Sequence, residues 1–289
     1  MKHLISFALL SCIMTPAFAD YCGVSKTIAE LISTTDISEL RVNVLAGYLD
    51  IQPGSGNNVN FSGRACTDEE QWLDWMTLDV ERDDKTLELT VIIPYQDDDF
   101  DADYAYMDVD LTIPEGLPTI VKDSSGDLLV HAVSVSRIDD SSGNIRVSEN
   151  RTSLEINDSS GSIEIRDLQG NLEVSDSSGD IDIRTVTGTV HIPRDSSGDI
   201  DIETVSGKVS VGSDGSGDID IQDIGADVEI GSDGSGGIKI RNVKGGVLIG
   251  SDGSGSVYVA DVSGKLLVEA KGSGGVRTRG IEGEISLPR

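Results

Sequence analysis

The 289-residue sequence has few aromatic residues, few histidines and little positive charge. Aromatic residues make up 4% of the chain, and its three histidines and three cysteines leave little material for a zinc site or a thiol-based catalytic site. With 22 basic against 51 acidic residues, the formal net charge is −29. This charge repels nucleic acid and anionic lipid, and it favours solubility and multivalent cations. We therefore expect no nucleic-acid partner.

Motifs of common hydrolases and nucleotide-binding enzymes are also missing. The sequence contains no G-x-S-x-G, no H-E-x-x-H and no P-loop. Paired carboxylates, which glycosidases use, occur along the whole chain and therefore do not indicate such an enzyme. We predict that the protein is not an enzyme. A β-helix that acts on polysaccharides is the remote alternative.

The start of the chain has the pattern of a secretory signal peptide. An apolar run from Leu4 to Met14 leads to an A-x-A site before Asp20, which predicts cleavage after residue 19. This run is too short for a transmembrane helix, and no other stretch approaches the roughly 20 apolar residues needed, so no transmembrane segment is expected. The protein is predicted to be exported to the periplasm, the outer surface or the medium. The alternative is a lipoprotein signal, with Leu9–Cys12 as the lipobox and Cys12 lipidated and retained.

Two cysteines, Cys22 and Cys66, remain after this cleavage. An even number of cysteines in an oxidising compartment predicts a disulfide. The bond would close a loop of about 45 residues, for which chain entropy gives a stabilisation of up to roughly 4 kcal/mol. We expect it to hold the start of the exported chain in place.

A short repeat fills the C-terminal part of the chain, from residue 123 onward. The phrase Asp-Ser-Ser-Gly or Asp-Gly-Ser-Gly begins at Asp123, Asp140, Asp158, Asp176, Asp195, Asp214, Asp233 and Asp252, and Lys-Gly-Ser-Gly begins at Lys271. The intervals are 17 to 19 residues. Self-similarity at such a period is typical of solenoids, in which each repeat stacks on the next. The sequence therefore predicts about nine stacked coils.

Each unit holds two short segments in which apolar and polar residues alternate. In the unit that starts at Asp195 these segments are Asp199–Ile202 and Lys208–Val211. Such alternation predicts strands with one buried face. An antiparallel meander would also hold two strands a unit, but it does not require the same residue type at the same point of every unit. A solenoid does, and an inward column recurs at Ile145, Ile163, Ile181, Ile200, Ile219 and Ile238.

We therefore predict an all-β protein, a parallel β-solenoid of about nine 17–19-residue coils over residues 123–289. Residues 20–122 are predicted to form an irregular β-rich capping region that is continuous with the repeats, because the first coil of a solenoid exposes unpaired backbone groups. Strands are expected at residues 40–44, 48–52, 72–81, 87–94 and 107–114, and a short helix at 28–32.

A family resemblance follows from the junction between the two regions. Residues 107–116, MDVDLTIPEG, are followed by KDSSGDLLV at 122–130 and then by serial S-G-x-I-x-[IV] units. This order resembles a widespread bacterial family of unknown function whose members carry the label "putative adhesin". The resemblance covers most of the exported chain. It implies a secreted or membrane-tethered β-strand repeat protein at the cell envelope, and it supplies no catalytic residues.

The outward positions of three successive units carry six aspartates that stacking would gather into one patch. They are Asp180, Asp182, Asp199, Asp201, Asp218 and Asp220. Stacked carboxylates repel one another, and Ca²⁺ is a hard cation that carboxylate oxygens would bind there. Hydration or raised pKa values are the alternatives. This patch is the candidate metal site, and no other cofactor is expected.

The aspartates that open the repeat units form a second column. Asp and Ser side chains commonly bond neighbouring backbone amides in tight turns, which is the favoured explanation for this column. Cation binding is the alternative, although the units lack the G-G-x-G-x-D pattern of calcium-binding β-rolls.

These features predict a non-enzymatic secreted or cell-envelope β-solenoid that presents an acidic surface for adhesion or assembly. A Ca²⁺-binding module that uses the stacked aspartates is the alternative. The expected partner is a protein or glycan at the cell envelope. Unpaired strand edges at the solenoid ends also favour self-association.

Overall fold

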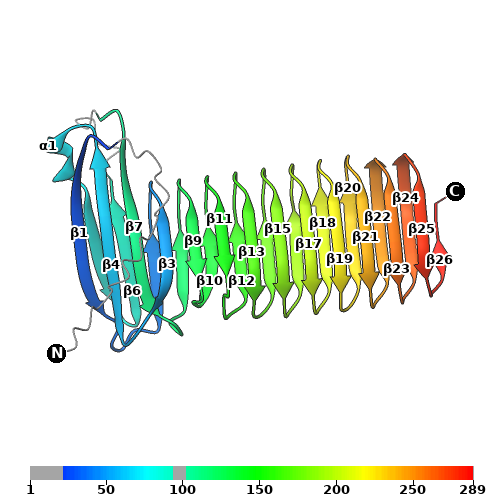
Figure 1. The fold of residues 1–289 in the computed structure, drawn as a ribbon, viewed down its shortest axis with the longest axis horizontal. Coiled ribbons are helices and arrows are strands. Elements are labelled where there is room, and N and C mark those ends of the chain that lie inside the picture. The colour runs from blue at the N-terminus through cyan, green and yellow to red at the C-terminus, as the bar shows by residue number, and fades with distance from the viewer. Residues whose placement is uncertain (1–21, 94–101, 289) are drawn as a thin grey trace, which may run out of the picture.

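The structure is a computed structural model that describes residues 22–93 and 102–288. Two sheets of thirteen strands each lie against one another and form a rod (Figure 1). Among these residues, no helix has the length and apolar character that crossing a bilayer requires. The predicted signal peptide, residues 1–19, lies outside the described residues.

Sheet A runs from the N-terminal end of the rod to its C-terminal end. Its strands are, in spatial order, β1 (Val24–Ser33), β4 (Asn58–Thr67), β7 (Ala105–Pro114), β3 (Leu49–Gly54), β9 (Leu128–His131), β11 (Ile145–Ser148), β13 (Ile163–Leu168), β15 (Ile181–Val186), β17 (Ile200–Val205), β19 (Ile219–Ile224), β21 (Ile238–Val243), β23 (Val257–Val262) and β25 (Val276–Ile281). Within it, β3 and all strands from β9 onward pair in parallel.

Sheet B covers the other face of the rod. Its strands are β5 (Thr77–Asp83), β6 (Thr86–Ile92), β2 (Glu39–Asn43), β8 (Thr119–Lys122), β10 (Val135–Asp139), β12 (Leu154–Asn157), β14 (Leu172–Ser175), β16 (Val190–Arg194), β18 (Val209–Asp214), β20 (Val228–Asp233), β22 (Val247–Ser254), β24 (Leu266–Ser273) and β26 (Ile285–Ser286). From β8 on, the chain alternates between the sheets, so that one strand of each sheet forms a coil.

The inward side chains of both sheets form one continuous core. The six isoleucines of the predicted inward column are 0–1% exposed. Ile200 pairs in register with Ile181 on one side and Ile219 on the other, so side chains of the same shape stack along the axis. Val205 closes the core at the end of β17 and is 1% exposed. The predicted parallel β-solenoid of about nine coils is confirmed.

The N-terminal part of the rod uses the same two sheets but adds antiparallel pairs. β1 pairs with β4, β4 with β7, and β5 with β6 in antiparallel fashion. Parallel pairing of β3 with β7 and β9, and of β2 with β6 and β8, joins these strands to the coils. A disulfide links Cys22 to Cys66, the latter at the end of β4.

Two sequence-based expectations in this region are wrong. Residues 28–32 lie in β1 rather than in a helix, because ten residues of β1 pair with β4, which supplies their backbone with hydrogen bonds. Residues 72–81 do not form one strand: a single helical turn, α1 (Glu70–Leu73), precedes β5. Trp72 and Leu73 are both 8% exposed, so the short helix buries its apolar side chains.

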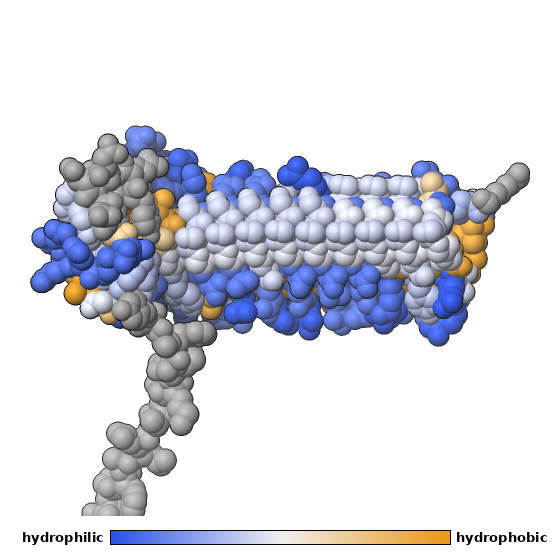
Figure 2. Space-filling model, turned by 90° about the horizontal axis from the view of Figure 1, so that it is seen from above, coloured by the Kyte–Doolittle hydropathy of each residue, from blue (hydrophilic) through white to orange (hydrophobic). Residues whose placement is uncertain are grey.

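The turns that carry the Asp-Ser-Ser-Gly phrases lie along one edge of the rod. Seen from above, a smooth band of near-neutral hydropathy runs along the coils, as expected of stacked serines and glycines (Figure 2). Strongly hydrophilic side chains project beside this band (Figure 2). The edge is therefore a close-packed row of small residues, and the long charged side chains lie on the sheet faces.

Candidate functional site

Three of the predicted metal ligands lie side by side on the outer face of sheet A. Asp182 on β15 pairs in register with Asp201 on β17, which pairs with Asp220 on β19. With Arg184 and Arg241 they line a shallow depression of about 160 Å³. The stacking of these three carboxylates follows from the coil register.

Basic side chains flank this row at both ends. Asp182 accepts a hydrogen bond from Nε of Arg184 at 2.9 Å. Asp220 pairs with Nζ of Lys239 at 2.7 Å and with Nη2 of Arg241 at 2.9 Å. Since all these groups are partly exposed, each pair stabilises the fold by only about 0–1 kcal/mol. In the middle, burial and the charges of Asp220 and Asp182 raise the pKa of Asp201.

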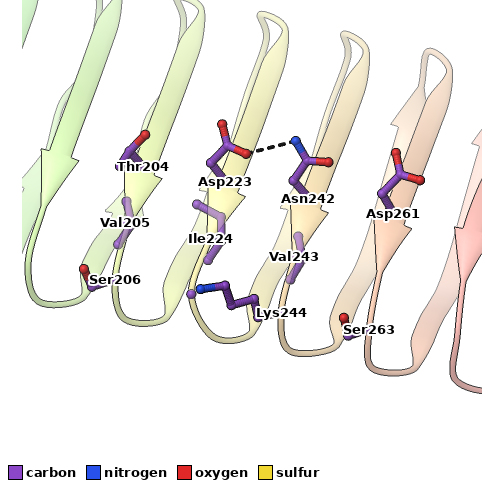
Figure 3. A pocket seen from close by; sticks show the side chains of 11 residues that line it. Thr204, Val205, Ser206, Asp223, Ile224, Asn242, Val243, Lys244, Asp261 and Ser263 are labelled. Carbon is purple, nitrogen blue, oxygen red and sulfur yellow. Dashed lines mark hydrogen bonds between the residues drawn. The ribbon is translucent and has the colours of Figure 1, made fainter.

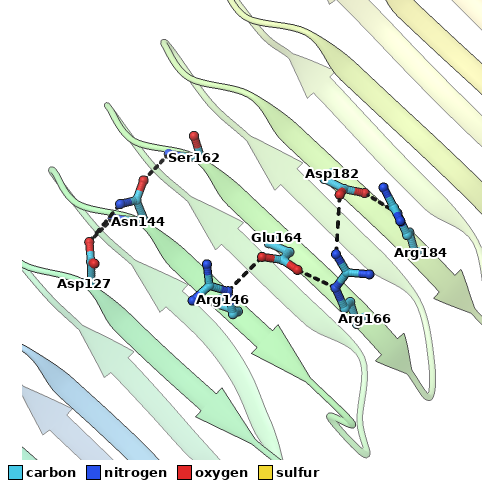
Figure 4. Close-up of polar contacts among 8 residues, drawn as sticks. All are labelled: Asp127, Asn144, Arg146, Ser162, Glu164, Arg166, Asp182 and Arg184. Carbon is cyan, nitrogen blue, oxygen red and sulfur yellow. Dashed lines mark hydrogen bonds and ion pairs between the residues drawn. The ribbon is translucent and has the colours of Figure 1, made fainter. Parts of the chain in front are cut away.

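The other three predicted ligands have a different role. Oδ1 of Asp180, Asp199 and Asp218 accepts the backbone N–H of the residue one coil further on, at 3.0, 2.8 and 2.7 Å respectively. Asn144 makes the same kind of bond to the N–H of Ser162 at 3.1 Å (Figure 4). These side chains therefore bond one coil to the next, so the six aspartates do not act as one set.

Charges of both signs alternate on the neighbouring coils of sheet A. Arg146 pairs with Glu164 at 2.7 Å, and Arg166 contacts both Glu164 and, at 3.8 Å, Asp182 (Figure 4). Hydrogen bonds from Arg146 and Arg166 lower the pKa of Glu164. The outer face is thus a mixed network on these coils and becomes predominantly acidic only around Asp201.

The described residues show no ready-made metal cage. Within 22–93 and 102–288, no group of three or more His, Cys, Asp or Glu side chains is placed to hold a metal ion. Calcium binding at the outer patch therefore stays a prediction.

The aspartates that open the repeat units are buried, which the sequence did not predict. Asp123, Asp140, Asp158, Asp176, Asp195, Asp214, Asp233 and Asp252 are between 0% and 6% exposed. We call these eight residues the buried aspartate column. In a representative turn, Oδ1 of Asp176 accepts the backbone N–H of Ser177 at 2.6 Å and of Ser178 at 3.2 Å. This bonding is the turn chemistry expected from the sequence.

Burial changes the acidity of the column. It is the largest cause that raises the pKa of Asp123 to about 7 and those of Asp140, Asp176, Asp214 and Asp233 to about 6. The charges of neighbouring aspartates of the column raise them further, and the serine N–H groups lower them. These carboxyls therefore titrate close to neutral pH.

A groove follows the opposite edge of the rod. It has a volume of about 600 Å³ and is lined by the ends of β17, β19, β21 and β23 and the turns after them (Figure 3). Its upper wall is a row of residues with left-handed backbone, Thr204, Asp223, Asn242 and Asp261, with φ between 56° and 60°. Nδ2 of Asn242 donates to Oδ1 of Asp223 at 2.9 Å. The groove is open and its polar atoms differ from coil to coil.

The family follows from the match of residues 32–223, about two-thirds of the chain, to the model described as Toastrack DUF4097. The chain belongs to this family. The match to the Toastrack model begins in β1 and ends in β19, so it includes both the antiparallel strands and most of the coils. No curated protein matches the chain.

Solved structures of proteins from two species are similar to this Toastrack chain. A putative adhesin from Parabacteroides distasonis is 17% identical, covers 89% of this chain and 98% of its own, and has a TM-score of 0.42. A putative lipid binding protein from the same species is 19% identical, with coverage of 91% and 96% and a TM-score of 0.41. A putative cell adhesion protein from Clostridium sporogenes is 13% identical, with coverage of 68% and 99% and a TM-score of 0.37.

Proposed function

We propose that this Toastrack protein is an exported, non-enzymatic β-solenoid of the cell envelope that presents its acidic outer face for adhesion or assembly. The observation that carries the proposal is the in-register stacking of outward side chains on sheet A, centred on Asp182, Asp201 and Asp220. A regular row of like groups on a flat sheet suits a repetitive or extended partner, such as a glycan or another envelope protein.

Several features support this role. The signal-peptide pattern and the Cys22–Cys66 disulfide agree with an oxidising compartment outside the cytoplasm. Proteins with adhesin names are among the similar solved structures. The net charge of −29 favours long-range attraction to basic partners.

The proposal is tested by binding of the purified exported chain to envelope preparations and to arrays of glycans. We expect saturable binding that weakens with salt, because exposed charges are screened. The triple variant Asp182→Asn/Asp201→Asn/Asp220→Asn should bind several-fold more weakly. A matched control is Asp74→Asn/Asp79→Asn/Asp83→Asn, which removes three exposed charges from the N-terminal region and should bind like the wild type.

The same samples are assayed for cleavage of acidic polysaccharides. Release of cleaved sugar that disappears in the Asp182/Asp201/Asp220 variant would contradict the non-enzymatic proposal. Equal binding by the wild type and this variant would contradict the role of the acidic face.

Calcium binding at the same three aspartates is the second candidate. In-register stacking brings the carboxylates of Asp182, Asp201 and Asp220 side by side, and burial together with the charges of Asp220 and Asp182 raises the pKa of Asp201. A bound Ca²⁺ would raise the melting temperature relative to EDTA, since only a ligand of the folded state stabilises it. The increase should disappear in the Asp182/Asp201/Asp220 variant.

A further inference from the structure

The buried aspartate column is closed by a different residue at each end. Backbone bonds define equivalent positions: the N–H of Asp123 bonds to the carbonyl of Asp139, and the N–H of Val44 bonds to the carbonyl of Lys122 in the same way. Val44 therefore precedes the column. At the other end Asp252 pairs with Lys271. The column thus runs from an apolar residue, through eight aspartates, to a lysine.

Lys271 provides the column with its terminal counter-charge. Its Nζ lies 2.7 Å from Oδ2 of Asp252 and donates to the carbonyls of Gly255 and Ser273 at 2.9 and 2.6 Å. The two charged side chains are 6% and 0% exposed. Only the last aspartate has this partner, because the ammonium group reaches one coil back.

The remaining seven aspartates each have a carboxyl oxygen that lacks a hydrogen-bond partner. Within the described residues, Oδ2 is buried without a hydrogen-bond partner in Asp123, Asp140, Asp158, Asp176, Asp195, Asp214 and Asp233. Oδ1 accepts serine N–H groups in most of these turns. A buried polar atom without a partner is unfavourable, and a buried carboxylate without a counter-charge is more so.

Protonation removes the uncompensated charge of a buried carboxylate. Successive coils lie about 4.8 Å apart, so ionised carboxylates in neighbouring turns repel one another where little water screens them. A protonated carboxyl carries no charge and has an O–H donor, which an ionised carboxylate lacks.

We propose that the buried aspartate column is a proton-binding element that makes the solenoid more stable at mildly acidic than at alkaline pH. It is independent of the proposed adhesion role, since it concerns the interior of the turns and not the outer face. Because neighbouring carboxyls interact, the charge of one changes the pKa of the next, and the column titrates as a set.

Charged groups that face the column mostly raise the pKa values of its aspartates. Asp180 faces Asp195, Asp199 faces Asp214, and both raise the pKa of the buried neighbour. Lys271 is the one cation that acts on Asp233, and it lowers the pKa there. Even at Asp233, where Lys271 opposes it, the net effect is a raised pKa of about 6.

The direction of the pH effect follows from the pKa values. In the unfolded chain an aspartate titrates near 3.8, and in the folded protein five of these carboxyls titrate at about 6 to 7. The folded state therefore binds more protons than the unfolded state between these values. The stabilisation is complete below about pH 4 and is lost as the pH rises through about 6 to 7.

The test compares thermal unfolding at about pH 5 and about pH 8, in EDTA and at constant ionic strength, followed by circular dichroism. Surface carboxylates are ionised throughout this window. We expect the wild type to melt roughly 5 °C or more lower at the higher pH. In Asp158→Asn/Asp176→Asn/Asp195→Asn this difference should shrink, and the variant should melt above the wild type at pH 8, because Asn is uncharged and supplies the missing donor.

Two controls keep the outcome decisive. Asp223→Asn makes the same chemical change at an exposed position, one coil from the natural Asn242, and should keep the wild-type pH difference. Asp176→Asn alone serves if the triple variant does not fold. His131 and His191 remain in every variant, so their titration cannot account for a difference between variants.

A melting temperature independent of pH would overturn the proposal. So would an equal loss of stability at both pH values in the asparagine variants, which would give the carboxylates a purely structural role. Metal ions that remain bound in EDTA, are detected by elemental mass spectrometry and are lost in the triple variant would also overturn it. They would show that a metal, and not protons, neutralises the column.

Discussion

Replacing Gly198 by alanine is expected to destabilise the solenoid by about 3 kcal/mol or more, and the physical reason is the stacking of the turns. Gly198 has φ +133°, a backbone conformation that other residues rarely adopt. A Cβ atom there would lie 1.9 Å from the carbonyl oxygen of Gly179 in the preceding coil. Neither turn can move aside, because the N–H groups of Gly179 and Gly198 both bond to the following coil, at 3.0 and 3.1 Å.

Urea denaturation of the two proteins, followed by circular dichroism, measures this effect. Gly116→Ala is the matched control, because no atom lies within 4 Å of a Cβ at that position. The control should unfold within about 1 kcal/mol of the wild type. Wild-type stability of Gly198→Ala would mean that the turns are not packed one on another.

Replacing Lys271 by methionine should cost about 3–5 kcal/mol in the C-terminal coils, because it leaves the buried Asp252 carboxylate without its counter-charge. Methionine keeps most of the side-chain volume and removes only the ammonium group. The loss should be local, since each coil of a repeat protein contacts only its neighbours. Hydrogen exchange of the amides of β22 to β26 should therefore accelerate, while β9 to β13 keep their protection.

A second substitution separates charge from packing at this position. Lys271→Met/Asp252→Asn removes both charges and should recover much of the lost protection, as buried ion pairs can be replaced by uncharged groups. Lys265→Met, an exposed lysine in the same coil, should have little effect. Equal amide hydrogen-exchange rates in Lys271→Met and the wild type would show that the C-terminal coils do not depend on Lys271 as a counter-charge.

The sequence predicted the coils well because stacking imposes its own period. Every unit must place a β-branched or aliphatic residue at the same inward point, and the isoleucines at 145, 163, 181, 200, 219 and 238 do so. This pattern excludes a meander on physical grounds, and it also fixes which residues face outward. The register of Asp182, Asp201 and Asp220 was therefore predictable from their spacing alone.

The N-terminal strands were less predictable because their partners are distant in sequence. Ile28 to Ile32 have no clear alternation, and only pairing with β4, some thirty residues later, makes them a strand. Likewise the turn of helix before β5 depends on where Trp72 and Leu73 find apolar neighbours. Such tertiary effects leave no periodic signal in a single sequence.

The burial of the aspartates that open the repeat units was not predicted, for the same kind of reason. An Asp-Ser-Ser-Gly turn is polar and is expected at the surface, so its composition does not indicate that Asp176 and its equivalents are buried. One signal was present: Lys271 stands where every other unit has aspartate. A lysine that ends a row of eight aspartates indicates a need for counter-charge inside that row.

The central claim is that the coils stack in parallel register with one coil for each repeat unit, since both aspartate columns depend on it. It is tested by the double variant Glu203→Cys/Gln222→Cys, whose positions pair directly on β17 and β19. Paired positions on adjacent parallel strands lie about 4.8 Å apart, within the range that a disulfide spans. Mild oxidation and peptide mass spectrometry should show this cross-link, and none in Glu203→Cys/Arg241→Cys, whose cysteines lie two coils apart. Absence of the first cross-link, or equal formation of the second, would contradict the stacked register.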